Sequence, residues 1–171
     1  MNVEPPADLQ RRPSWLAVLP DLLFRPERPV RYIAVAWALS FAGSMLLSFL
    51  VHAVSPDLAG PDFGKQPAAI LMFLVVILSP LIETLMMAAF ILLLLRLVAP
   101  ATAVVASAVA WGAFHSSFAP AWGLVIWWPF LIFSIAFVTW RERGFWVAVG
   151  LVALTHGLQN LLPAALALTG H

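Results

Sequence analysis

The stretch at residues 68–96, AAILMFLVVILSPLIETLMMAAFILLLLR, decides the class of this protein. Its only ionisable residues are Glu83 and Arg96. At about 1.5 Å of rise per residue, a helix of this length is long enough to cross about 30 Å of hydrocarbon. Pro80 lies within the stretch, so we expect one kinked helix, with a break into two pieces as the alternative.

The rest of the chain has the same apolar character. Hydrophobic residues make up 63% of the 171 residues and charged residues only 10%, and the mean hydropathy is +0.97. A soluble fold of this length does not hide so much apolar surface, so lipid must be the solvent for its outer faces. We therefore predict an all-α integral membrane protein, a bundle of about five transmembrane helices at residues 32–54, 68–96, 101–118, 122–140 and 144–168. There is no cysteine, which excludes disulfides and thiolate chemistry.

Residues 1–31 precede the first span and are predicted to form a cytoplasmic tail. The amino end is polar, and no small-residue cleavage site follows the first apolar stretch, so we expect no cleaved signal peptide. Residues 14–24, SWLAVLPDLLF, are apolar but too short to cross and are interrupted by Pro20. We expect an interfacial helix there, with a partly ordered tail as the alternative.

The arginines predict the orientation. Five of them precede the first span, Arg96 closes the second, and Arg141 and Arg143 link the fourth and fifth. Five alternating spans bring all of these to one side, and cytoplasmic loops are enriched in Lys and Arg. The amino end is therefore predicted to be cytoplasmic and the carboxyl end outside. Because no organellar targeting feature is present, we expect a multi-pass protein of a bacterial inner membrane.

Ionisable residues within the predicted spans are few. Counted from the arginine-bearing ends of their helices, Glu83, His115 and His156 all lie about 18 to 21 Å deep, at about 1.5 Å per residue. Asn160 follows His156 by four residues and so shares its helical face. An ionisable group in hydrocarbon costs a few kcal/mol, so we expect these four side chains to converge on one site. His52, near the outer end of its span, is interpreted as an interfacial residue without a functional role.

Several kinds of chemistry suit such a cluster. A carboxylate and an imidazole that share a water can deprotonate it for attack on an amide, and a second imidazole with an amide can stabilise the oxyanion. Zinc binding is an alternative, because Glu, His and His form a known ligand set, although no closely spaced ligand pair supports a metal. A proton pathway would string polar groups along several depths. Interhelical hydrogen bonds that only hold the bundle together are the simplest alternative.

Three short motifs follow one another along the chain: SPLIETLMMAAF with Glu83, WGAFH with Trp111 and His115, and HGLQN with His156 and Asn160. In this order and spacing, residues 68–165 resemble the CPBP intramembrane proteases. This family is also called Abi and includes the eukaryotic CAAX prenyl endopeptidase. The resemblance implies that Glu83 and His115 activate water and that His156 and Asn160 form the oxyanion hole.

The first motif departs from the family pattern. The family has a Glu-Glu pair with an Arg four residues after the second Glu, whereas this chain has Thr84 and Ala88 at those two positions. The resemblance implies a supporting role behind the site for Thr84, as a hydrogen-bond donor to Glu83, and for the aromatic Trp111.

We therefore expect an endopeptidase that cuts a membrane-embedded or lipid-anchored protein substrate within the lipid bilayer, with no metal, no other cofactor and no nucleic-acid partner. The alternative is an inactive member of the family that acts as a membrane binding, sorting or immunity scaffold.

Overall fold

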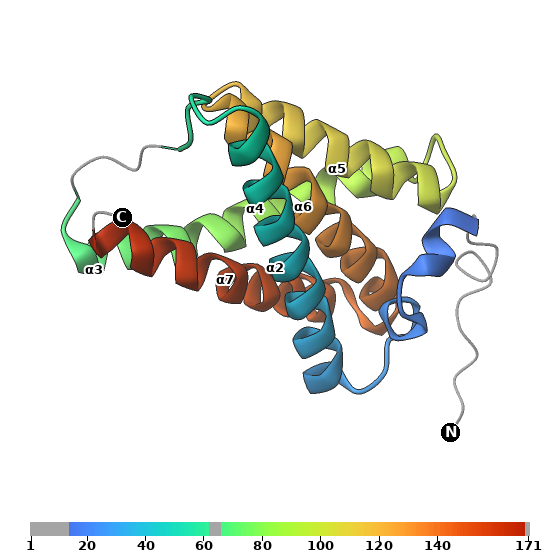
Figure 1. Ribbon diagram of the computed structural model, residues 1–171. Helices are drawn as coiled ribbons and strands as arrows, with labels where there is room; N and C mark the ends of the chain where they lie inside the picture. Colours follow the sequence, from blue (N-terminus) through green and yellow to red (C-terminus); the bar gives the residue numbers. More distant parts are fainter. Residues whose placement is uncertain (1–13, 62–65, 170–171) are drawn as a thin grey trace.

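The computed structural model describes residues 14–61 and 66–169, which form helices and no strand (Figure 1). The long elements are α2 (Pro29–Val54), α4 (Ser79–Leu94), α5 (Pro100–Ser116), α6 (Pro120–Trp140) and α7 (Phe145–Thr169). α3 (Ala68–Met72) and the π-helix η3 (Phe73–Leu78) lead into α4, and three short 3-10 helices are η1 (Ser14–Val18), η2 (Asp21–Phe24) and η4 (Arg141–Arg143). The predicted all-α class is confirmed, whereas residues 1–13 of the predicted tail lie outside the described residues.

Four stretches of the described chain are long and apolar enough to cross a membrane: Pro29–Val54, Ala68–Leu94, Pro120–Arg143 and Phe145–Leu166. The protein therefore has the helices of a multi-pass membrane protein. The remaining predicted span, residues 101–118, corresponds to α5, which has 17 residues. At about 1.5 Å per residue α5 is slightly shorter than the hydrocarbon thickness, so its crossing stays a prediction.

Hydrogen bonds show which helix ends lie together. The backbone N–H of Ala121 donates to the carbonyl of Ala59 at 3.2 Å, which joins the start of α6 to the segment after α2. At the other end of the molecule, the carbonyl of Leu23 accepts from the hydroxyls of Tyr32 and Thr139, each at 2.9 Å. These bonds join η2 to the start of α2 and the end of α6. α2 and α6 therefore run in opposite directions, and Figure 1 shows that α4, α5, α6 and α7 each turn back along the helix before.

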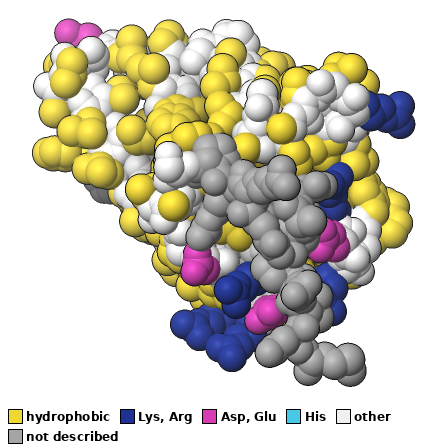
Figure 2. Space-filling model, turned by 90° about the vertical axis from the view of Figure 1, so that its right-hand side faces the viewer, with side chains coloured by type: hydrophobic (Ala, Val, Ile, Leu, Met, Phe, Trp, Pro, Cys, Tyr) yellow, Lys and Arg dark blue, Asp and Glu magenta, His cyan; other side chains and the backbone are white. Residues whose placement is uncertain are grey.

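Alternation brings the arginines of the described residues to one end of the bundle, which we call the arginine end. It consists of η2, the start of α2, the end of α4 and η4, and it carries Arg25, Arg28, Arg31, Arg96, Arg141 and Arg143. Figure 2 looks toward this side, where dark blue Lys and Arg side chains lie low in the view and along its right side. We call the end formed by the close of α2, residues 55–61 and the α5–α6 turn the opposite end. Which end faces the cytoplasm stays a prediction.

Helix α6 forms the centre of the bundle. Every residue from 129 to 140 is buried, and α6 packs against α2, α5 and α7 (Figure 1). Apolar residues cover all sides of this helix, as is typical of a helix surrounded by others. Trp128 fixes α2 against it, since its indole N–H donates to the carbonyl of Leu39 at 2.9 Å. The indole occupies the space beside Gly43, where any Cβ would lie within 2 Å of the Trp128 nitrogen.

The segment before α2 is ordered and packed onto the bundle. Leu16, Leu19, Leu23 and Phe24 are all buried, and Pro20 separates η1 from η2. The partly ordered tail is therefore wrong for these residues. Two short 3-10 helices also replace the expected single interfacial helix, because Pro20 ends the first turn and cannot donate the hydrogen bonds of a continuing helix.

Pro80 leaves the helix continuous, and the break into two pieces is wrong. The chain is helical from Ala68 to Leu94 and widens into the π-helix η3 just before the proline. The N–H of Ser79 donates to the carbonyl of Leu74, five residues earlier. In this register the next donor would be the N–H of Pro80, which does not exist, so the carbonyl of Val75 receives no bond from position 80.

Candidate active site

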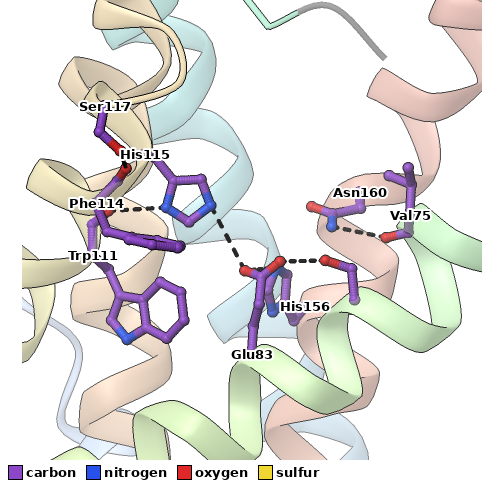
Figure 3. A network of polar contacts seen from close by, with 9 residues as sticks. Val75, Glu83, Trp111, Phe114, His115, Ser117, His156 and Asn160 are labelled. Carbon is purple, nitrogen blue, oxygen red and sulfur yellow. Dashed lines mark hydrogen bonds and ion pairs between the residues drawn. The ribbon is translucent and has the colours of Figure 1, made fainter. Parts of the chain in front are cut away.

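Side chains from three helices meet around one carboxylate oxygen (Figure 3). Oε2 of Glu83 on α4 lies 3.8 Å from Nε2 of His115 on α5 and 3.9 Å from Nε2 of His156 on α7. Both imidazoles are buried, and the Glu83 side chain is 20% exposed. The structure thus brings together the acid and the two histidines that were predicted to share one depth.

These groups line a cavity of about 390 Å³, which is within the range of small ligand sites. Glu83, His115, His156 and Asn160 all contribute to its wall. A single water occupies about 30 Å³ of liquid, so the cavity has room for several waters or for a short piece of polypeptide.

His115 is oriented by its own helix and by aromatic neighbours. Its Nδ1 lies 2.9 Å from the carbonyl of Trp111, which can only accept, so Nδ1 carries a hydrogen. In the neutral imidazole Nε2 is then an acceptor that faces Glu83. The ring of Trp111 stacks on Phe130 at 4.5 Å, and Trp122 packs edge-on against His115 at 4.6 Å. Trp111 therefore supports His115 through its backbone carbonyl and its buried ring.

His156 is held among aromatic rings of α6. Its ring centroid lies 4.7 Å from that of Phe133 and 5.3 Å from that of Phe130. Within the described residues its Nδ1 is buried without a hydrogen-bond partner. Packing rather than a hydrogen bond therefore sets the direction in which Nε2 points.

The two oxygens of the Glu83 carboxylate differ in their hydrogen bonding. Ser79, one turn earlier on α4, donates its hydroxyl to Oε1. Oε2 is buried and has no hydrogen-bond partner among the described residues. The distances of 3.8 and 3.9 Å to the imidazoles are too long for direct hydrogen bonds but suit a bridging water. A water that donates to Glu83 and to Nε2 of His115 would satisfy two facing acceptors.

Asn160 belongs to the same wall but is bonded to backbone. Its Nδ2 donates to the carbonyl of Val75 at 3.0 Å, the carbonyl that Pro80 leaves without a helical donor (Figure 3). Gly157 allows this approach, because a Cβ there would lie only 2.5 Å from the carbonyl oxygen of Val76. The amide nitrogen has a second hydrogen, which is not used in this bond.

Thr84 and Ala88 face the interior of the bundle, with exposures of 1% and 0%. The Thr84 hydroxyl has no hydrogen-bond partner among the described residues, so the expected donation to Glu83 is not found. Ser79 makes that donation instead. A Glu and an Arg at positions 84 and 88 would both be buried on one helical face.

Sequence reasoning missed three contributors to the site. Ser79 was detectable, because residues four apart on a helix are neighbours. Gln159 bonds to Ser40 at 2.9 Å and to Ser44 at 3.2 Å and ties α7 to α2, and its position between His156 and Asn160 was the available signal. His52 lines the cavity, a position that its place near the end of its helix did not reveal. Among the described residues, no group of three His, Asp or Glu side chains has the geometry of a metal site.

Fold and site together define a multi-pass helical membrane protein in which a carboxylate and two imidazoles converge on a cavity between the helices. No protein-family model matches the chain, and neither a curated protein nor a solved structure is detectably similar to it. Any functional assignment therefore rests on the geometry of the site and on the three motifs.

Proposed function

We propose that this protein is an intramembrane endopeptidase that hydrolyses peptide bonds with water activated by Glu83 and His115. One observation carries the proposal: Oε2 of Glu83 is buried without a partner, on a cavity wall, between two imidazole nitrogens. An unpaired buried carboxylate oxygen costs free energy, so its retention calls for a ligand that completes it. Water is the smallest ligand that does so.

The reaction follows from these positions. Glu83 takes a proton from the water as its oxygen attacks the carbonyl carbon of the peptide bond. Nε2 of His115 accepts the second hydrogen bond of the water and keeps its lone pairs aimed into the cavity. The Nε2–H of His156 and the free N–H of Asn160 stabilise the oxyanion of the tetrahedral intermediate. The C–N bond then breaks and the proton on Glu83 passes to the leaving nitrogen. A carboxylic acid and an amine result, and the acid gives its remaining proton to the amine to leave a carboxylate and an ammonium group.

The surroundings favour a membrane-embedded or lipid-anchored polypeptide as substrate. The cavity lies between α2 and η3–α4, among helices that are long and apolar enough to cross a membrane. A peptide bond that enters such a site loses its hydrogen bonds to water, so polar groups on the wall must replace them. We place this activity in a bacterial inner membrane, with the arginine end in the cytoplasm.

A catalytically inactive scaffold is the second candidate, and one observation favours it. The buried positions 84 and 88 hold Thr and Ala where the CPBP family has Glu and Arg. A scaffold would use the four polar side chains for interhelical contacts alone.

The two candidates differ in their response to Glu83→Gln, which keeps the size and the hydrogen bond to Ser79 but removes the base. We expect the variant to accumulate in the membrane while the protein termini produced by processing disappear from the cell. Thr84→Val is the matched control on the next residue, because it removes a hydroxyl that has no partner. It should leave the termini unchanged. Normal termini with Glu83→Gln favour the scaffold.

A further inference from the structure

The residues around the cavity come from one end of the bundle. Beyond Glu83 and the histidines, the wall is formed by the close of α2, by residues 58, 60 and 61 of the following segment, by Ala121 and Trp122 at the start of α6, and by Asn160 and Pro163 late in α7. All of these lie toward the opposite end. None of the described residues of η2, η4 or the start of α2 lines the cavity.

Toward the arginine end the bundle is closed by apolar side chains. One turn beyond Glu83, Met87 and Ala88 are 1% and 0% exposed, and Ile91 follows at 0%. Phe133 and Phe137 of α6 are buried at 1% and 0%. Interiors of this kind are close-packed, so water and a polypeptide have no passage through this half of the molecule.

The face of α2 that lines the cavity carries a row of polar residues. Ser44, Ser48 and His52, with Ser55 directly after the helix, follow one another at helical spacing, and Met45 and Val51 contribute apolar side chains to the same wall. The neighbouring face is apolar: Phe49 is 68% exposed and does not line the cavity. Hydroxyl and imidazole groups are hydrogen-bonding partners for a main chain that has left water. Ser44 accepts an interhelical hydrogen bond from Gln159 of α7 at 3.2 Å, but Ser48, His52 and Ser55 continue the row out of the bundle.

We propose that an extended polypeptide segment, and the water that cleaves it, reach Glu83 from the opposite end of the bundle, along the polar face of α2. The substrates are then proteins whose cleaved segment stands on the membrane side away from the arginines, which the arginine distribution assigns to the outside. Ser48 and His52 contact the incoming main chain. The identity of the substrate rests on the proposed function, whereas the route of water does not.

The absence of cysteine allows a direct test with single-cysteine variants. Ser48→Cys reports on the cavity, and Phe49→Cys, one residue away, is the matched lipid-facing control. Gly60→Cys marks the opposite end, where a Cβ meets no atom within 4 Å, and Glu142→Cys marks the arginine end. A charged, membrane-impermeant methanethiosulfonate is added to intact spheroplasts and to inverted vesicles, and its rate of reaction with each cysteine is measured.

Ser48→Cys should react from the same side as Gly60→Cys, and at least about tenfold faster than Phe49→Cys, because a thiol among lipid tails does not ionise readily. Reaction of Ser48→Cys from the side of Glu142→Cys, or from neither side, overturns the route. The modified Ser48→Cys protein should also lose substrate processing, which the modified Glu142→Cys protein retains, because Glu142 does not line the cavity. Full processing by modified Ser48→Cys overturns substrate entry along α2, even with hydrolysis at Glu83 intact. Whether the protein hydrolyses peptide bonds at all is a separate question, which the Glu83→Gln variant answers.

Discussion

Replacing Gly157 by alanine perturbs the contact on which the site geometry depends. The new Cβ would lie 2.5 Å from the carbonyl oxygen of Val76 and 3.7 Å from its carbon. Real Cβ atoms essentially never come closer than 3.0 Å to another heavy atom, and here the obstacle is backbone, so α7 and η3 must separate by at least about 0.5 Å. His156 and Asn160 move with α7, away from the carboxylate on α4.

The expected loss of stability in Gly157→Ala follows from overpacking. Forcing an extra carbon into a packed contact costs about 1 to 3 kcal/mol. Alanine recovers about 0.5 to 1 kcal/mol of helix propensity, so a net loss of stability of about 0 to 2.5 kcal/mol is expected. A misplacement of about 1 Å can cost about 10²-fold in rate, so a shift half as large should cost roughly tenfold. Stability is measured by titrating micelles of the purified protein with denaturing detergent.

Gly150→Ala is the matched control on the same helix, because a Cβ at Gly150 meets nothing within 4 Å. It should be neutral or slightly stabilising and should process substrate at the wild-type rate. If Gly157→Ala is as stable as Gly150→Ala and equally active, the close packing of α7 on η3 does not maintain the site, and our reasoning about this contact is refuted.

Three further results are expected. Ser79→Ala should lower the initial rate of processing by about 10- to 100-fold, by analogy with groups that orient metal ligands, whereas Ser79→Thr keeps the hydroxyl and most of the rate. Reporter fusions within Arg141–Arg143 and at His171 should lie on opposite sides of the membrane, and finding both on one side would remove the alternation of the spans. Dialysis against chelators should leave processing unchanged, and elemental analysis should find no stoichiometric zinc; tight zinc would assign water activation to a metal.

The sequence predicted the elements of the fold because apolar length and helical rise are local quantities. Equal depth along three helices was also enough to predict that Glu83, His115 and His156 meet. The π-helix before Pro80 was not predictable, because a proline in the sequence shows only that one α-helical hydrogen bond is missing there. Which backbone geometry the chain adopts around the proline depends on Gly157 and Asn160, which lie on another helix.

The direction in which α2 faces was not predicted. Its apolar residues do not reveal which side meets the bundle, but Ser44, Ser48 and His52 recur every four residues, and this spacing was the available signal. Taken alone, His52 was interpreted as a residue of the interface, although the structure includes it in the cavity wall. The role of Ser79 was available from its spacing to Glu83. Gln159 was also detectable from its position between His156 and Asn160, whereas its bonds to Ser40 and Ser44 of α2 are known only from the tertiary structure.

The most direct test of the central claim is the rate of peptide hydrolysis by purified Glu83→Gln in lipid vesicles, on the substrate that the comparison of termini identifies. If Glu83 is the base that activates water, the rate should fall by about 10² to 10⁴ while the variant unfolds at the same detergent concentration as the wild type. A rate within about threefold of the wild type, well short of the loss expected for a general base, would contradict the account.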